Sequence, residues 1–136
     1  MLVSGDRVDG AVTFATVASD GPDAWLAEVA ERTRGWRYAR VAAAVTGLVD
    51  GGAWSALNPA TLRLPEGYPL ASRLQSVFGV PAIAANDAQA AAWGEHRYGA
   101  GAREDMVFLT ISTGVGGGVV LNGRPLLGLA GHFGQQ

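Results

Sequence analysis

The sequence predicts an α/β protein built on a mixed sheet, and three observations carry this prediction. In the middle of the chain, short apolar runs typical of buried strands alternate with segments that have apolar residues at helical spacing. Short strand-like segments and glycine turns lie at both ends, which is typical of antiparallel hairpins. Hydrophobic residues make up 49% of the 136 residues and charged residues 16%, a balance that excludes a disordered chain.

The first part of the chain is predicted to hold three strands and one helix. Residues 2–4 and 11–17 are predicted strands, the second because apolar and polar residues alternate in it. A helix is predicted to begin at Asp20-Gly21-Pro22, because proline is favoured in a first turn and the apolar residues that follow have helical spacing. Residues 38–45 form an apolar run that suits a buried strand, and Thr46-Gly47 ends it.

The second part is predicted to continue this alternation. One helix lies between Pro69, which suits a helix start, and Gly79, which ends it. Another helix covers 88–98 after Asn86-Asp87, whose side chains suit an N-cap. The predicted strands of this part are 54–57, 81–85, 106–112, 116–121 and 124–127, the last after an Asn122-Gly123 turn.

The composition excludes several classes of function. The formal net charge is −2, so the chain offers no basic field for a nucleic-acid partner. All ten basic residues are arginines, which excludes a P-loop lysine and a Schiff-base lysine. Cysteine is absent, which excludes disulfides, thiol nucleophiles and thiolate zinc sites. No membrane-spanning stretch and no leader peptide are visible, so we expect a cytoplasmic protein with no membrane partner.

The strongest local signal is a glycine-rich run at 111–118, between two predicted strands. Successive glycines allow backbone N–H groups to converge on one point and form an anion-binding nest, and the Thr113 hydroxyl adds a donor. A dinucleotide-binding fingerprint is not supported, because a strand rather than a helix follows and no acidic residue occurs after Asp105. A glycine-rich hairpin without a ligand stays open as the alternative.

Single residues outside this run could also carry chemistry. Asp87 could cap a helix or, since a helix dipole favours a carboxylate, act as a general base that orients a substrate hydroxyl for attack on phosphorus. His132 lies in a loop flanked by glycines, where a ligand contact and a solvated loop are equally open. His96 is predicted to be a surface residue, and the four scattered tryptophans are predicted to serve packing.

Several segments together resemble the ROK family, the sugar kinases and repressors of the actin-like ATPase superfamily. Within that family the likeness is greatest to bacterial N-acetylmannosamine kinases, and the segments keep the family's order and spacing over most of the chain. They are Thr46–Gly51, Ala56–Pro59, Asn86–Trp93, Asp105–Val120 and Leu129–Gly134. The resemblance implies the actin-like, ribonuclease H-like fold, with a mixed sheet and helices.

The same resemblance implies roles for individual residues. It implies that Asp87 takes the proton from the 6-hydroxyl of a hexose, and that ATP and Mg²⁺ are the cofactors. The implied sugar-binding residues are Asn86, Gly47 and His132, and the implied phosphate-binding residues are Thr113, Gly114, Gly116 and Gly117. Most family members have glutamate where this chain has His132, and N-acetylmannosamine kinases can have histidine. Among hexoses and N-acetylhexosamines, the resemblance therefore favours N-acetylmannosamine, with glucose as the alternative.

The chain also departs from the family pattern. The Asp-x-Gly-Gly-Thr phosphate loop of the family's first strand does not occur in these 136 residues, and the family's zinc site is not present. We therefore expect residues 1–103 to form one lobe without its first strand, and residues 104–136 to form the opening strands of a second lobe. Unpaired strand edges invite association, so a homo-oligomer is a possible consequence.

Two functions stay open at this point. The first is ATP-dependent phosphorylation of a hexose, as in the complete family enzyme, and the second is an inactive remnant that binds sugar or phosphate. Because phosphoryl transfer needs both substrates aligned in a closed cleft, we expect this chain alone to be inactive. A repressor would need a helix-turn-helix, which residues 1–45 are not predicted to contain.

Overall fold

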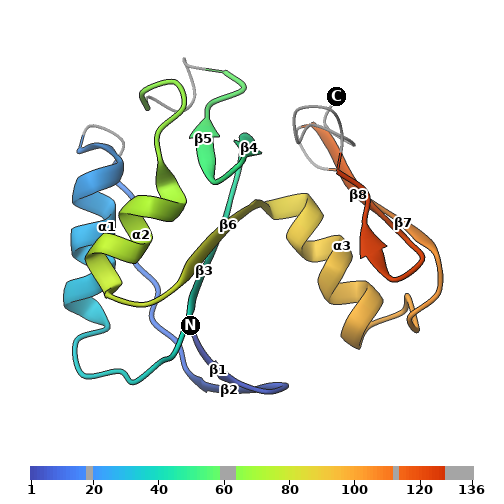
Figure 1. Ribbon diagram of the computed structural model, residues 1–136, viewed down its shortest axis with the longest axis horizontal. Helices are drawn as coiled ribbons and strands as arrows, with labels where there is room; N and C mark the ends of the chain where they lie inside the picture. The colour runs from blue at the N-terminus through green and yellow to red at the C-terminus, as the bar shows by residue number, and fades with distance from the viewer. Residues whose placement is uncertain (18–19, 59–63, 112–113, 128–136) are drawn as a thin grey trace.

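The structure is a computed structural model that describes residues 1–17, 20–58, 64–111 and 114–127. Its elements are β1 (Leu2–Ser4), β2 (Arg7–Gly10), α1 (Gly21–Arg32), β3 (Val41–Val45), β4 (Leu48–Asp50), β5 (Ala53–Ser55), α2 (Leu70–Phe78), β6 (Ala82–Asn86), α3 (Asp87–Tyr98), β7 (Met106–Ile111), β8 (Val115–Leu121) and β9 (Arg124–Pro125). Figure 1 shows that they form two regions. The N-terminal region holds everything up to β6, and the C-terminal region consists of α3 and strands β7 to β9. None of the described helices is long and apolar enough to cross a membrane.

The strands pair both in parallel and in antiparallel, as expected for a mixed α/β protein. The parallel pair is β3 with β6, in the N-terminal region. The described strands otherwise form antiparallel sheets: β1 with β2, β4 with β5, and the meander β7-β8-β9. Helix α2 packs on β3 and β6, and α1 packs on α2, so both helices lie on the same side of the parallel pair (Figure 1).

Large side chains fill the core of the N-terminal region. Alternate residues of β3 and β6 face this core, and the helices bring leucines to it at helical spacing. The buried cluster consists of Leu26, Trp54, Tyr68, Leu70 and Leu74. The opposite face of the parallel pair is open, since Ala42 and Ala44 are exposed and Ile83 is 68% exposed.

A polar clasp joins α1 to the start of α2. The buried Tyr68 hydroxyl donates a hydrogen bond to Asp23 Oδ1 at 2.5 Å, and Arg73 Nε donates to the same oxygen at 2.9 Å. These two donors, the Tyr68 hydroxyl first, lower the pKa of the Asp23 carboxyl below its ordinary value. Burial, followed by the hydrogen bond to Asp23, raises the pKa of Tyr68.

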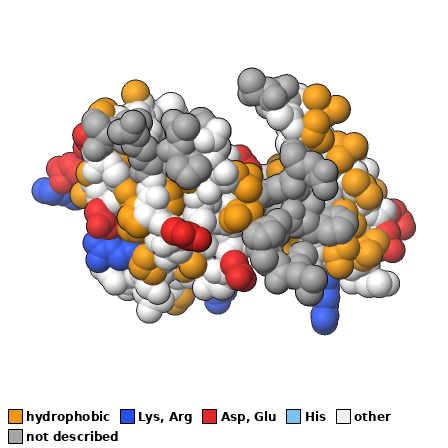
Figure 2. Space-filling model, turned by 90° about the horizontal axis from the view of Figure 1, so that it is seen from above, with side chains coloured by type: hydrophobic (Ala, Val, Ile, Leu, Met, Phe, Trp, Pro, Cys, Tyr) orange, Lys and Arg blue, Asp and Glu red, His pale blue; other side chains and the backbone are white. Residues whose placement is uncertain are grey.

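Small residues build the C-terminal region. Helix α3 lies on β7 and β8, and its contact residues Ala88 and Ala92 are buried against glycines of β8. Val120 of β8 is completely buried, whereas Val107, Leu109 and Ile111 on β7 are each more than 60% exposed. Figure 2 shows hydrophobic side chains at the surface of this part of the molecule.

Most predicted elements are present, but one predicted strand is absent and two strands, β2 and β4, were not predicted. Residues 11–17 do not form the predicted strand; the partner of β1 is instead β2, directly after the Gly5 turn. Leu2 pairs with Gly10 at the end of this hairpin, so β1 has no residues left to pair with 11–17. Strand β4, the short run between the turn at Thr46-Gly47 and the turn at Gly51-Gly52, was not predicted.

Candidate functional site

Two of the predicted sugar-binding residues, Gly47 and Asn86, lie at the carboxyl ends of β3 and β6. Val45 pairs with Asn86 in the last position of the parallel register, so Gly47 and Asp87 leave the sheet at the same end. In open α/β sheets, ligands bind outside the carboxyl ends of the strands. The topology therefore brings Gly47, Asn86 and Asp87 together in the place where such a fold binds its ligands.

Asn86 links the turn after β3 to the start of α3. Its side chain is buried, and its Oδ1 accepts hydrogen bonds from the N–H groups of Ala88 at 3.0 Å and Gln89 at 3.1 Å. Its Nδ2 donates to the carbonyl oxygen of Gly47 at 3.0 Å. The predicted N-cap is confirmed by these contacts. A role of Asn86 as a sugar ligand stays a prediction.

Asp87 is the first residue of α3, and it is exposed. Its Oδ1 accepts a hydrogen bond from the N–H of Ala88 at 2.8 Å. Among the described ion pairs, none involves this carboxylate. An exposed carboxylate at a helix N-terminus is accessible to a hydroxyl donor, which a general base requires. The catalytic role of Asp87 stays a prediction.

Gly47 is confined in two ways. Its backbone has φ +102°, and a Cβ at this position would lie 2.5 Å from the carbonyl oxygen of Ser55. A side chain is therefore excluded by conformation and by space. Gly47 therefore contacts its neighbours through backbone atoms, and its carbonyl oxygen accepts the hydrogen bond from Asn86 Nδ2.

The glycine-rich run lies beside the first turns of α3. A Cβ on Gly116 would lie 3.5 Å from the Ala88 Cβ, and one on Gly118 would lie 2.7 Å from the Ala92 Cβ. The absence of side chains on Gly116 and Gly118 therefore lets α3 lie directly on β8 (Figure 1). Since Asp87 precedes Ala88, this contact brings the predicted base and the predicted phosphate-binding segment into one neighbourhood.

Gly116, Gly117 and Gly118 lie in the regular strand β8. The predicted anion-binding nest belongs to the turn before this strand, which includes residues outside the described part of the chain, so the nest stays a prediction. Gly114 lies in the turn before β8, is exposed, and has nothing within 4 Å of an added Cβ. Among the described phosphate-binding candidates, Gly114 is therefore the most exposed, since Gly116 is half-buried and Gly117 is buried. Thr113 and His132 lie outside the described residues.

The family model described as "ROK family" matches residues 24–136, which is most of the chain. The chain belongs to the ROK family. The strand that follows the glycine run agrees with this assignment, since a dinucleotide-binding fingerprint would open a helix there. Solved ROK sugar kinases share the fold of this chain, so the predicted actin-like architecture is confirmed.

Three relatives illustrate the range of this ROK likeness. The "Bifunctional enzyme NanE/NanK" of Brucella melitensis is 50% identical over 98% of this chain and 27% of its own length. The N-acetylmannosamine kinase of Citrobacter koseri is 52% identical over 71% of this chain and 34% of its own length. A ROK glucokinase from Streptomyces griseus, in complex with glucose and AMPPNP, superposes with a TM-score of 0.67 at 32% identity, over 83% of this chain and 36% of that chain. The chain thus spans between 27% and 36% of the length of these three relatives.

His96 is buried, at 3% exposure, so the prediction that it is a surface residue is wrong. Its ring stacks on Trp93 with centroids 5.3 Å apart, and neither ring nitrogen has a hydrogen-bond partner among the described residues. Gly101 folds back onto this end of α3, where its added Cβ would lie 2.7 Å from His96 Cα. The spacing of His96 four residues after Ala92, itself four after Ala88, is the signal that could have placed it on the buried face.

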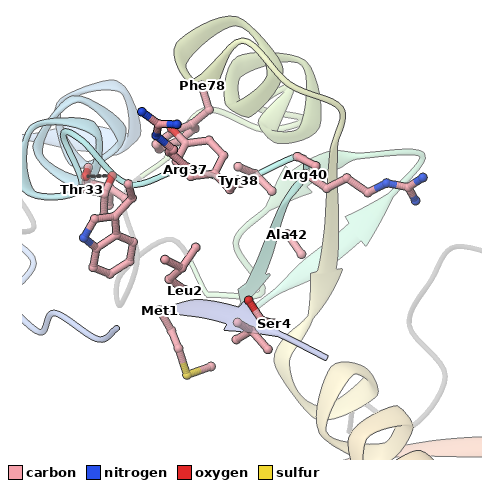
Figure 3. A pocket seen from close by; sticks show the side chains of 14 residues that line it. Met1, Leu2, Ser4, Thr33, Arg37, Tyr38, Arg40, Ala42 and Phe78 are labelled. Carbon is pink, nitrogen blue, oxygen red and sulfur yellow. Dashed lines mark hydrogen bonds between the residues drawn. The ribbon is translucent and has the colours of Figure 1, made fainter. Parts of the chain in front are cut away.

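A cavity of about 700 Å³ lies at the other end of β3 (Figure 3). Its walls are β1, the segment 36–42 that leads into β3, and side chains of α1 and α2. Arg37 and Arg40 are the charged side chains among its described lining residues, and none of those residues carries a carboxylate. This cavity is separate from Asp87, because it lies at the amino end of β3 whereas Asp87 follows the carboxyl ends of the parallel strands.

A metal ion would find few protein ligands in the described part of the chain. No group of three or more His, Asp or Glu side chains is arranged to hold one there. Mg²⁺ in kinases usually binds through one or two carboxylates and the phosphates of the nucleotide. A Mg²⁺ ion at this site would therefore depend on the nucleotide and on water for most of its ligands.

Proposed function

We propose that this chain forms the sugar-binding and base-carrying part of a ROK hexose kinase, which transfers the γ-phosphoryl group of ATP to the 6-hydroxyl of N-acetylmannosamine. The observation that carries the proposal is the position of Asp87. It is an exposed carboxylate at the N-terminus of α3, at the carboxyl end of the parallel pair, and next to the contact between α3 and the glycines of β8. The names of the kinase relatives support sugar phosphorylation as the reaction.

In the proposed reaction, the Asp87 carboxylate accepts the proton of the sugar 6-hydroxyl while the hydroxyl oxygen bonds to the γ-phosphorus. The bond from this phosphorus to the bridging oxygen breaks, and ADP leaves. Asn86, Gly47 and His132 are the proposed sugar-binding residues. Thr113, Gly114, Gly116 and Gly117 are the proposed phosphate-binding residues, with Gly114 best supported because its backbone is accessible.

The proposed preference for N-acetylmannosamine over glucose depends on His132. A neutral imidazole offers one donor and one acceptor, whereas the glutamate of most family members offers acceptors only. A site built around polar partners discriminates against a sugar that leaves them unpaired. The name of the Citrobacter koseri relative supports N-acetylmannosamine, and the glucose complex of the Streptomyces griseus relative supports glucose as the second candidate.

A chimera tests the proposal. The matching segment of the Citrobacter koseri N-acetylmannosamine kinase is replaced by this chain, and ADP release is measured with ATP and either N-acetylmannosamine or glucose. We expect turnover with a preference for N-acetylmannosamine, and we expect Asp87→Asn to lower kcat by about 10²- to 10⁴-fold, the usual contribution of a general base. Asp6→Asn, in the exposed β1–β2 turn, is the matched control and should leave kcat unchanged. An active chimera that tolerates Asp87→Asn would refute the role of the base.

The alternative is a binding module without turnover. In the same assay we expect the 136-residue chain alone to release ADP at the background rate, because the Asp-x-Gly-Gly-Thr loop is not among its residues. Ordinary kinase rates from this chain alone would contradict that expectation. An inactive chimera that still binds the sugar in calorimetry would favour the binding module.

A further inference from the structure

The indole of Trp54 is tied to the turn that leads to the candidate site. Its Nε1 donates a hydrogen bond to the carbonyl oxygen of Thr46 at 2.7 Å. Thr46 and Gly47 form the turn after β3, and the next carbonyl oxygen, that of Gly47, accepts the hydrogen bond of Asn86. Trp54 was predicted to serve packing alone, and this directional contact is an additional role that the sequence did not show.

The turn has little freedom to move away from the β4–β5 hairpin. A Cβ on Gly47 would lie 2.5 Å from the Ser55 carbonyl oxygen and 3.3 Å from Trp54 Nε1, so the backbone of the turn lies against β5. Because Trp54 and Ser55 are neighbours on this strand, one short segment holds the turn through packing and through a hydrogen bond.

Trp54 itself is fixed by the core. It is 6% exposed, and its backbone N–H and carbonyl oxygen are both bonded to Tyr68, at 2.7 and 2.8 Å. Its ring contacts the rings of Trp25 and Tyr68, with centroids 6.3 and 6.4 Å apart. A side chain locked in this way can transmit its position to the turn that it binds.

We infer that Trp54 is a positioning residue for Asp87. The chain of contacts runs from the Trp54 indole to the Thr46-Gly47 turn, from Gly47 to the Asn86 amide, and from Asn86 to the first N–H groups of α3. Asp87 lies inside this last step, between Asn86 and Ala88. This inference rests on the proposed function of Asp87, because the place of this carboxylate matters for catalysis only if Asp87 is the base.

The test compares Trp54→Phe with Trp25→Phe in the 136-residue chain. Trp25 is a matched control: it belongs to the same ring cluster, and its Nε1 donates a hydrogen bond of 2.8 Å to a backbone carbonyl oxygen, that of Val17, away from the site. Each variant loses one indole donor and keeps an aromatic ring. If the two indoles only stabilise the fold, both variants should change the start of α3 to the same extent. If Trp54 positions Asp87, only Trp54→Phe should change it.

Amide hydrogen exchange and the Asn86 side-chain resonances, both by NMR, are the primary measurements. For Trp54→Phe we expect exchange at Ala88 and Gln89 to become about threefold to tenfold faster, the change for loss of one hydrogen bond, with a shift of the Asn86 amide signals. Trp25→Phe should change neither. Equal effects of the two variants, or no effect of Trp54→Phe, would overturn the inference.

Two additions keep the result clear. If Trp54→Phe does not fold, 3-benzothienylalanine at position 54 keeps the ring volume and removes only the N–H donor, and the same exchange rates decide.

Titration with N-acetylmannosamine then separates this inference from the proposed function. We expect the dissociation constant to rise by about threefold to tenfold in Trp54→Phe alone. If the unmodified chain does not bind the sugar, the proposed function fails, while the exchange rates still decide whether Trp54 positions the start of α3.

Discussion

The N-terminal and C-terminal regions are held together by opposite means. In the N-terminal region, aromatic rings and leucines fill the space between helices and sheet, and Leu70 and Leu74 are at most 3% exposed. In the C-terminal region, α3 lies on β8 because Gly116 and Gly118 have no side chains. The N-terminal region thus depends on large side chains that fill its core. The C-terminal region depends on glycines, whose lack of a side chain lets the helix approach the strand.

This difference shows that the two regions are vulnerable to opposite changes. A filled core loses stability when atoms are removed, because the cavity that remains is not refilled completely. A close helix–strand contact loses stability when atoms are added, because neighbours must move apart or strain. Buried area is also unequal, since β7 keeps Val107, Leu109 and Ile111 largely exposed. The C-terminal region therefore depends on a single packed face.

Leu74→Ala should lower the free energy of unfolding more than the other changes, and the loss should be greater in the N-terminal region than in the C-terminal region. Leu74 is 3% exposed in the buried cluster, so we expect a loss of about 2–5 kcal/mol in the free energy of unfolding. Urea denaturation followed by ¹⁹F NMR of fluorotryptophan at Trp54 and Trp93 measures it in each region. A loss below 1 kcal/mol, against the range for buried leucine, would mean that large side chains do not hold this region.

Gly118→Ala should destabilise the C-terminal region by about 1–3 kcal/mol, the range for overpacking. The new Cβ would lie 2.7 Å from the Ala92 Cβ and 3.2 Å from Gln89 Cα. Gly114→Ala is the control, because nothing lies within 4 Å of its added Cβ. The same denaturation, read at Trp93 in α3, should separate the two variants. If Gly118→Ala and Gly114→Ala were equally stable, the close contact between α3 and β8 would not be what stabilises the C-terminal region.

Acid should produce the smallest effect and should act on the N-terminal region through the Asp23 clasp. The hydrogen bonds from Tyr68 and Arg73 lower the pKa of Asp23 in the folded state, so the clasp stabilises the fold above the ordinary value of 3.8. This contribution is lost as the pH falls through the lowered pKa. We expect the stability advantage of the unmodified chain over Asp23→Asn to shrink below pH 3.8. An advantage that is constant from pH 7 to pH 2 would contradict the clasp.

The sequence predicted best those features that depend on neighbouring residues. α2 lies between Pro69 and Gly79 as predicted, because Gly79 adopts the left-handed conformation that ends a helix. The Asn86 cap was likewise readable from one side chain and the two N–H groups after it. At the candidate site, this local pattern was enough to locate Asn86 and Asp87 at the start of α3.

Features that depend on distant segments could not be predicted from local patterns. Residues 11–17 alternate like a strand, yet a strand needs a partner, and β1 is already paired as far as Gly10. The burial of His96 depends on Gly101 folding back over α3. The link from Trp54 to Thr46 joins residues eight positions apart through the shape of the β4–β5 hairpin, which the sequence did not reveal.

The bridge made by Asn86 also has a mechanical consequence. It is the last residue of β6 and the cap of α3, so the two regions meet at its backbone, while its side chain reaches back to Gly47. A rotation of one region against the other about this pivot would displace each group in proportion to its distance from it. Asp87 lies beside the pivot, so its displacement would be small, whereas the far end of the β7–β8 hairpin would be displaced most. Such a rotation would therefore change the distance from Asp87 to Gly47 less than the distance from β7 to the N-terminal region.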